Sequence, residues 1–247
     1  MNIINSLKSN KEDVIRQLEY LMTWLEEAKN YGIDITETKL KLKRVMEDVK
    51  SGKLKVVLAG GFSEGKTTVT ASWLGKIESN MKIDPTESSD KIEVYRPEGF
   101  ESDCEIVDTP GLFGYKEKVE NSEKIKFEDV TKEYISEAHL VLYVLNSVNS
   151  LKESHKESVK WLLRDLGKLK NTVFILNRFD DVCDIEDYED YEETLKIKKS
   201  SVINQLRNFI ALTSKEERDL QIVGVSANPF EKGLEYFFQN KEKYNEL

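Results

Sequence analysis

A glycine-rich segment, GGFSEGKTT, separates an apolar run from a helical pattern, and its residue types suit phosphate binding. Gly60, four further residues and Gly65-Lys66-Thr67 fit the pattern G-x-x-x-x-G-K-[ST] between an expected strand and an expected helix. Glycines let backbone N–H groups turn toward phosphate oxygens, and the helix adds its positive N-terminal end. Lys66 would reach the β- and γ-phosphates, and the Thr67 hydroxyl would bind Mg²⁺. The expected nucleotide contacts of this loop are Gly61, Phe62, Ser63, Glu64, Gly65, Lys66, Thr67 and Thr68.

A second segment, IVDTPG, ends another expected strand with a carboxylate. Asp108 is placed to hold Mg²⁺, usually through a water, and the Gly111 N–H can donate to a γ-phosphate. Alone, the string is an ordinary strand-to-turn sequence; after a phosphate loop it predicts a nucleotide switch. A third Mg²⁺ ligand is expected between residues 82 and 95, where we choose Thr86, with Ser88 and Ser89 behind it. The alternative is that Thr86 is an ordinary loop residue.

Two further strings follow expected strands and suit recognition of a base. In FILNRFD, the Asp180 carboxylate can accept two hydrogen bonds from guanine N1–H and N2–H2, a donor pair that adenine lacks. Arg178 is expected to lie over the base, and Asn177 to tie this loop to the phosphate loop. In VSANPF, the Ala227 N–H is expected at guanine O6, with Ser226 bracing the loop.

These two base-binding strings also give the remaining contact residues, which are Asn177, Arg178, Asp180, Ser226, Ala227 and Asn228. Each string alone is often a helix cap or a turn. Ligands of α/β sheets bind at the carboxyl ends of the strands, where all four strings lie, so their joint order predicts GTP and GDP as ligands. An ATPase is excluded by the type of residue at Asn177 and Asp180.

Elements that would position these residues alternate along the chain from Leu54 onward. Apolar runs typical of strands are expected at 54–60, 91–96, 104–109, 140–145, 171–176 and 220–226. Helical patterns lie at 66–75, 125–137, 153–166 and 194–212. The alternation predicts an α/β fold of three layers, the P-loop NTPase G-domain, with a mainly parallel sheet. The acidic segment 180–193 is interpreted as a solvated insertion rather than as a metal site.

Residues 1–50 have a different pattern and predict two amphipathic helices. One apolar helix face is expected from Val14, Leu18, Leu21, Leu25 and Ala28. Gly32 would end the first helix, Asp34 and Glu37 resemble a capping box for the second, and Gly52 would end it. The helices either pack on their own domain or form a neck or partner interface.

Composition limits the class of protein. The 247 residues carry a net charge of −9, which disfavours nucleic-acid binding. Cys104 and Cys183 show no disulfide-like or CxxC spacing, and the N-terminus has no signal-peptide pattern, so a cytoplasmic location is expected. The longest apolar stretch, 140–145, is too short to span a bilayer.

The four motifs in order resemble translation-factor-like GTPases, and the longer strings GGFSEGKTTV, VDTPGLFG and SANPF resemble the dynamin-like group, including bacterial members. The resemblance covers a GTPase domain at 51–247, and residues 1–50 resemble the family's neck segment. It implies GTP hydrolysis after G domains pair across their nucleotides, as a homodimer or with a related dynamin-like chain. It also implies membrane remodelling through a helical stalk and peripheral membrane association. No such stalk is expected within these residues, so the sequence is either a GTPase-domain fragment or a short relative that acts with another chain.

The catalytic residues implied by this resemblance are Ser63, Lys66, Thr86 and Gly111. Leu112 stands where Ras-type GTPases place a water-orienting Gln, and Phe62 stands where dynamin has a Gln before the matching Ser63. Hydrolysis would then rely on Ser63, a K⁺ or Na⁺ ion and the partner protomer. The two apolar residues also favour a second hypothesis, a GTP-gated binding module that hydrolyses slowly.

Overall fold

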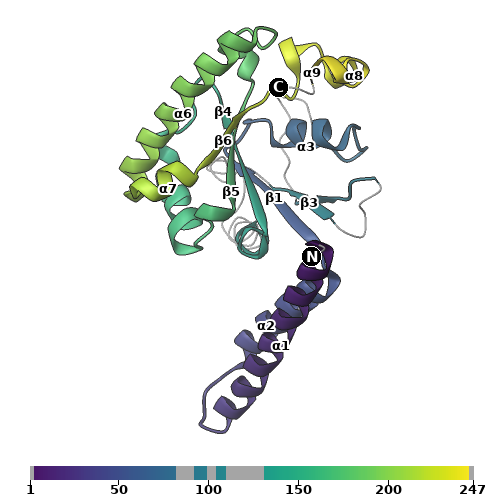
Figure 1. Ribbon diagram of the computed structural model, residues 1–247, viewed down its shortest axis with the longest axis vertical. Coiled ribbons are helices and arrows are strands. Elements are labelled where there is room, and N and C mark those ends of the chain that lie inside the picture. Colours follow the sequence, from purple (N-terminus) through teal and green to yellow (C-terminus); the bar gives the residue numbers. More distant parts are fainter. Residues whose placement is uncertain (1–2, 82–91, 99–103, 110–130, 245–247) are drawn as a thin grey trace, which may run out of the picture. The chain divides into compact units, whose positions relative to one another are not determined.

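The computed structural model describes residues 3–81, 92–98, 104–109 and 131–244. The chain divides into two compact units between Leu54 and Lys55 (Figure 1). The first unit contains two helices, α1 (Ile3–Lys29) and α2 (Thr36–Ser51). No helix within the described ranges is long and apolar enough to cross a membrane.

Within the described residues, the second unit is built on a sheet of six strands in the order β2-β3-β1-β4-β5-β6. The strands are β1 (Leu54–Gly60), β2 (Glu93–Tyr95), β3 (Cys104–Asp108), β4 (Leu140–Asn146), β5 (Thr172–Asn177) and β6 (Gln221–Gly224). β1 pairs with β4, β4 with β5 and β5 with β6 in parallel, whereas β2 pairs with β3 in antiparallel fashion. All six expected strands are present, and the predicted α/β fold with a mainly parallel sheet is confirmed.

Helices connect these strands. They are α3 (Lys66–Leu74), a helix over 131–137, η1 (Glu153–His155), α5 (Lys156–Lys160), the π-helical turn η2 (Trp161–Asp165), α6 (Tyr188–Ile210), α7 (Ser214–Asp219), α8 (Leu234–Gln239) and α9 (Lys241–Tyr244). Short 3₁₀ turns lie at η3 (Leu169–Asn171), η4 (Phe179–Asp181) and η5 (Pro229–Glu231). The helical pattern expected at 153–166 is therefore present as three successive helical turns of different pitch.

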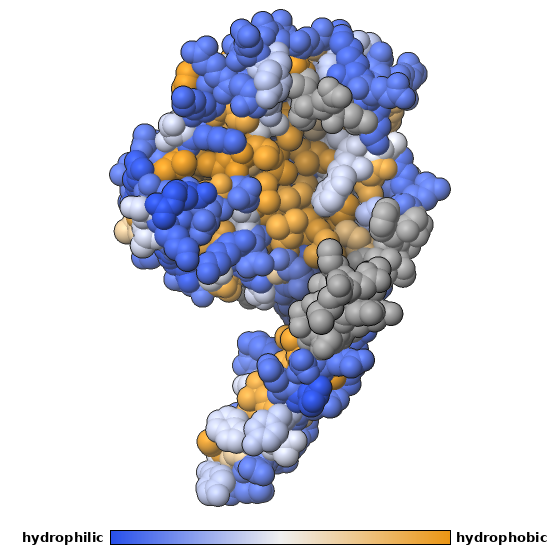
Figure 2. Space-filling model, in the orientation of Figure 1, coloured by the Kyte–Doolittle hydropathy of each residue, from blue (hydrophilic) through white to orange (hydrophobic). Residues whose placement is uncertain are grey.

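The two faces of the sheet are packed differently, as the alternation along β4 shows. Val141, Tyr143 and Leu145 belong to the main core together with apolar residues of α5, η2 and α6. Because successive side chains of a strand point to opposite faces, Leu140 and Leu142 lie on the other face. On that face they line a mostly apolar cavity of about 460 Å³, together with residues of α3, α8 and α9. In Figure 2, apolar residues of the second unit gather in a hollow that polar residues surround.

The acidic segment is partly helical, which corrects its interpretation as an insertion. α6 begins at Tyr188, six residues before the expected start, because Asp187 caps it by accepting from the amides of Glu189 and Asp190. Carboxylates in the first turn also favour the positive end of a helix. Acidic residues there stabilise the start of α6 and hide its apolar periodicity.

The capping box expected at the start of the second helix is absent. Ile35, not Asp34, is the N-cap residue of α2, and it makes no side-chain cap bond. Asp34 Oδ1 instead accepts from the Thr36 amide at 3.0 Å, which forms a turn ahead of the helix. Gly52 does end α2, in the left-handed conformation, as expected.

The apolar face expected on α1 is only half buried. Leu25 and Ala28 form a small core with Ile35 and Leu42 of the α2 side, and Leu18 packs against it. Val14 and Leu21 are exposed. The two helices therefore bury only part of the predicted apolar face. The domain boundary between residues 50 and 51 stays a prediction.

Candidate functional site

Loops that follow β1, β3, β5 and β6 carry the residues singled out in the sequence. The first loop passes through two glycines that no other residue would replace without strain. Gly60 has φ 147°, and a Cβ atom there would lie 2.3 Å from the Val144 carbonyl oxygen. Gly65 has φ 84°, and its Cβ would lie 2.4 Å from Nδ2 of Asn177. The loop therefore passes close to β4 and β5 before α3 begins at Lys66.

Lys66 is buried at the start of α3. Its Nζ donates to the carbonyl oxygen of Gly61 at 2.8 Å. Burial lowers the pKa of Lys66, and the nearby carboxylates of Asp108 and Glu64 act against that shift. A buried ammonium beside a helix N-terminus gives this loop a concentrated positive charge, as anion binding requires.

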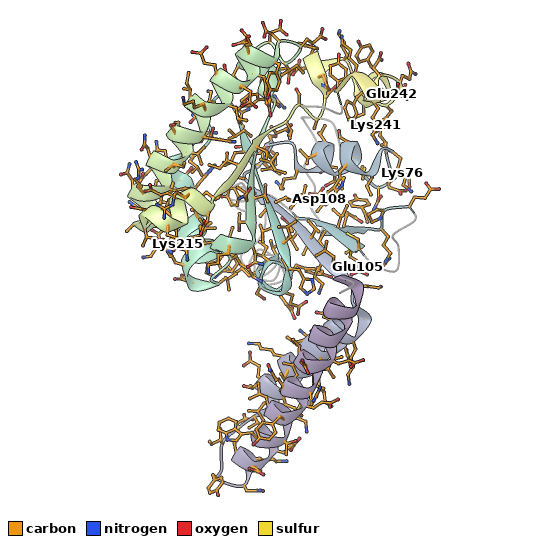
Figure 3. The ribbon with its side chains drawn as sticks, in the orientation of Figure 1. Lys76, Glu105, Asp108, Lys215, Lys241 and Glu242 are labelled. Carbon is orange, nitrogen blue, oxygen red and sulfur yellow. The ribbon has the colours of Figure 1, made fainter. Side chains whose placement is uncertain are left out.

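Asp108 ends β3 and contacts α3 (Figure 3). Its Oδ2 accepts from the Thr67 hydroxyl at 2.6 Å, and the residue is 1% exposed. Its Oδ1 is buried and has no hydrogen-bond partner among the residues that the structure describes. Burial raises the pKa of Asp108, against the Thr67 hydrogen bond and the charge of Lys66. A hydroxyl beside a carboxylate with one unsatisfied oxygen fits a small divalent cation that prefers oxygen ligands.

Asn177, at the end of β5, joins the first loop to the last. Its Nδ2 donates to the Glu64 carbonyl oxygen at 3.1 Å, and its Oδ1 accepts from the Ala227 amide at 3.3 Å. The contact with the phosphate loop is the one that the sequence led us to expect. The Ala227 N–H, expected to meet guanine O6, donates to Asn177 in this structure.

Asp180 is held from two sides by the segment after β6. Oδ1 accepts from the Ser226 hydroxyl, and Oδ2 accepts from the Phe230 amide at 2.7 Å. Burial raises the pKa of Asp180, and the hydrogen bond from Phe230 acts against this. The Ser226 contact is the brace predicted from the sequence. Each carboxylate oxygen keeps a second lone pair, so the carboxylate is oriented and still able to accept.

The other predicted site residues take varied positions. Arg178 has a left-handed backbone, with φ 58°, at the turn between β5 and Asp180. Phe62 and Ser63 are exposed on the phosphate loop, Thr68 is half-buried in α3, and Asn228 Oδ1 accepts from the Gly233 amide at 2.7 Å. Thr86, Ser88, Ser89, Gly111 and Leu112 lie outside the described residues. The roles of all these residues stay predictions.

Sequence reasoning missed two serines that connect the loops. The Ser147 hydroxyl donates to the Arg178 carbonyl oxygen at 2.5 Å, and the Ser72 hydroxyl donates to the Ala227 carbonyl oxygen at 2.6 Å. Ser147 follows the end of β4, and the rule that drew attention to the other strand ends would have found it. Ser72 lies within α3, and no local pattern marks it.

Comparison with known proteins identifies the family. A sequence profile of the dynamin family matches residues 74–179, and a profile of the dynamin-like helical domain matches residues 212–247. The structure of LeoA, a bacterial dynamin GTPase from ETEC, is 41% identical over 98% of this chain, with a TM-score of 0.67. The chain belongs to the dynamin-like GTPase family.

LeoA is a longer protein than this chain. This dynamin-like chain spans 42% of the length of LeoA. Toc33 from Arabidopsis thaliana is 19% identical over 78% of this chain and 79% of its own, with a TM-score of 0.54, which supports the fold alone. The segment that matches the helical-domain profile includes β6 and Ser226, so part of that match lies within the sheet and the candidate site.

Proposed function

We propose that this dynamin-like G domain binds GTP with Mg²⁺ and hydrolyses it. The observation that carries the proposal is the pair of hydrogen bonds made by the Asn177 side chain, which donates to the Glu64 carbonyl oxygen and accepts from the Ala227 N–H. These bonds fix the loop suited to phosphates relative to the loops suited to a base. A site with a buried cation at one end and an oriented carboxylate at the other matches a nucleotide.

Guanine is the base that the second end favours. Asp180 would accept from guanine N1–H and N2–H2 while Ser226 keeps the carboxylate in place. Adenine offers no matching pair of donors, and the half-buried Asp180 carboxylate, covered by adenine but given no donors, would cost binding energy. The Ala227 N–H would exchange or share its bond with Asn177 to reach guanine O6.

Thr67 and Asp108 would hold Mg²⁺, with Thr86 as a third ligand. The buried Oδ1 of Asp108, which has no hydrogen-bond partner among the described residues, supports this assignment. Bound there, the ion supplies positive charge that screens the phosphates. Lys66 would leave the Gly61 carbonyl to bind phosphate oxygens, and the backbone of Ser63 and Gly111 would hold the γ-phosphate.

Catalysis would depend on a second G domain. Phe62 is exposed on the phosphate loop and has no group that can orient water, and Leu112 has none either. Ser63, a K⁺ or Na⁺ ion beside it and a paired protomer or related chain would supply the missing charge and positioning. Dimerization is important for the GTPase activity of the chloroplast translocon components atToc33 and psToc159, which share this fold. Membrane remodelling would belong to a fuller assembly.

Turnover measured against protein concentration tests this proposal. We expect turnover per molecule to rise with concentration and to be higher in K⁺ or Na⁺ than in a large inert cation. Light scattering should show the strongest pairing with GDP–aluminium fluoride, because contacts that accelerate a reaction are strongest in its transition state. Turnover that is negligible at concentrations where the loaded protein pairs would favour the GTP-gated binding module, which the apolar Phe62 supports.

A further inference from the structure

The phosphate loop contains a buried carboxylate that the proposed chemistry does not use. Glu64 is 5% exposed, and burial raises the pKa of its carboxyl group. Its side chain lies against the backbone of the same loop, since a Cβ atom on Gly61 would stand 3.2 Å from both Cγ and Oε1 of Glu64. A negative charge buried within a loop suited to phosphates weakens anion binding unless a cation compensates it.

The end of β4 and the segment that follows it supply polar and charged groups beside this carboxylate. The backbone N–H of Asn146 donates to it, and Lys152 Nζ lies 4.0 Å from Oε1. His155, which is 3% exposed, places Nε2 3.5 Å from the same Cβ position on Gly61. Residues 146–155 therefore contact the phosphate loop on the side of the Glu64 carboxylate.

In the part of the chain that the structure describes, three cations act on Glu64, and they differ in their other proposed contacts. Lys152, Lys66 and Arg178 each lower its pKa, with Lys152 the largest of the three. Lys66 and Arg178 are assigned to the phosphates and the base, so a bound nucleotide would share their charge. Lys152 has no part in the proposed nucleotide contacts, and its side chain is 49% exposed. Among the described residues, it is the cation left for Glu64 when the nucleotide is bound.

We propose that Lys152 is a positioning residue that compensates the buried charge of Glu64 and so sets how strongly the phosphate loop holds a triphosphate. The inference rests on the proposed binding of GTP by this loop. Lys152 is half-exposed and lies ahead of α5, outside the nucleotide contacts. A change at Lys152 would therefore alter the affinity of the loop for phosphate without touching the nucleotide. GTP is affected more than GDP, because GTP carries more negative charge near Glu64.

Substitution of Lys152 in the full chain tests the inference. Lys152→Met lowers the affinity for fluorescent GTP about fivefold, as for a partly exposed pair, and lowers that for GDP less. The loss appears in KM rather than in kcat. Lys152→Arg restores the affinity. Lys156→Met is the matched control: this lysine pairs with the exposed Glu153 one turn away, and its removal leaves both affinities unchanged.

The Glu64→Gln background separates a charge effect from a structural one. An amide keeps the size of the side chain but has no charge to compensate, so Lys152→Met causes no further loss of GTP affinity there. An equal loss in both backgrounds, or no loss in the wild type, overturns the inference.

A wild-type chain that binds no GTP in this assay contradicts the proposed function alone. The interaction of Lys152 with Glu64 is then tested by urea unfolding without nucleotide. A double-mutant cycle of Glu64→Gln and Lys152→Met must show a favourable coupling in the free energy of unfolding. A coupling of zero overturns the inference whether or not GTP binds.

Discussion

The phosphate end and the base end of the candidate site are built in opposite ways. At the phosphate end, Lys66 and Asp108 are buried charges with shifted pKa values, and Oδ1 of Asp108 has no partner among the described residues. At the base end, both polar atoms of the Asn177 amide and both oxygens of Asp180 are hydrogen-bonded. The phosphate end therefore contains buried charges and one carboxylate oxygen without a partner among the described residues, whereas the side chains at the base end are already held in place by hydrogen bonds.

This difference indicates which end of the site would contribute mainly affinity and which would contribute mainly specificity. Unsatisfied buried charges cost stability in the empty protein and regain it when an oppositely charged ligand arrives, so the phosphate end would supply affinity. A hydrogen-bonded, rigid end loses little entropy on binding and rejects a base that does not match, so the base end would supply specificity. Substitutions at the two ends should therefore affect stability in opposite directions.

The largest effect is expected at Lys66. Lys66→Met removes the buried cation but keeps an apolar chain of similar length, so GTP affinity should fall by about 100-fold or more. The midpoint of thermal unfolding without nucleotide should stay the same or rise, because the desolvation of the Lys66 ammonium outweighs its attraction to the carboxylates of Asp108 and Glu64. Titration calorimetry and thermal unfolding check the two parts. A clear loss of stability would contradict the picture of an unsatisfied phosphate end.

Asn177→Ala should instead destabilise the empty protein. It leaves the Glu64 carbonyl and the Ala227 N–H without their partner in a buried region, at a cost of about 2–4 kcal/mol in the free energy of unfolding. Asn171→Ala is the control, because it removes one exposed hydrogen bond, to the His139 carbonyl, and should cost less than about 1 kcal/mol. Equal costs in urea unfolding would show that the base end is not held by Asn177.

The smallest effect on the site is expected from an ion pair that lies outside both ends. Arg164, and then the Thr213 amide, lower the pKa of Glu216 to about 2. Because folding lowers the pKa of Glu216, its carboxylate stabilises the folded state above the unfolded pKa of about 4.5. This stabilisation is lost as the pH falls toward 2. Glu216→Gln should flatten the fall of the unfolding temperature over that range and leave GTP affinity unchanged. A changed affinity would mean that α7 is coupled to the site.

Much of the fold followed from local patterns, and much of the site from strand ends. The strands were predictable because buried parallel strands are short apolar runs, and a β1 run followed by GGFSEGKT leaves few alternatives. The Asn177 bridge was predictable because the loops that follow the parallel strands of one sheet lie along the same edge of that sheet. The start of α6 was not, since the Asp187 cap lies within a run of acids that reads as a loop.

Long-range contacts made by common residue types escaped prediction. Lys152 lies about 90 positions from Glu64 in the chain, and the two side chains come within 4.0 Å because β1 and β4 are neighbours in the sheet. The two positive φ values at Phe230 and Glu231 shape the segment that donates to Asp180, and neither residue type signals that conformation. Side-chain types at strand ends therefore predict which ligand class suits the site, whereas the contacts around them need the structure.

The most direct test of the account is a competition measurement with GTP, ATP and xanthosine triphosphate, each with Mg²⁺ and with a chelator. We predict that the wild type prefers GTP over ATP by about 100-fold or more and that the chelator weakens GTP binding. Asp180→Asn should lose GTP affinity and gain affinity for xanthosine triphosphate, because the amide donates where the carboxylate accepted. Equal binding of ATP and GTP, or GTP binding that is unaffected by the chelator, would contradict the central claim.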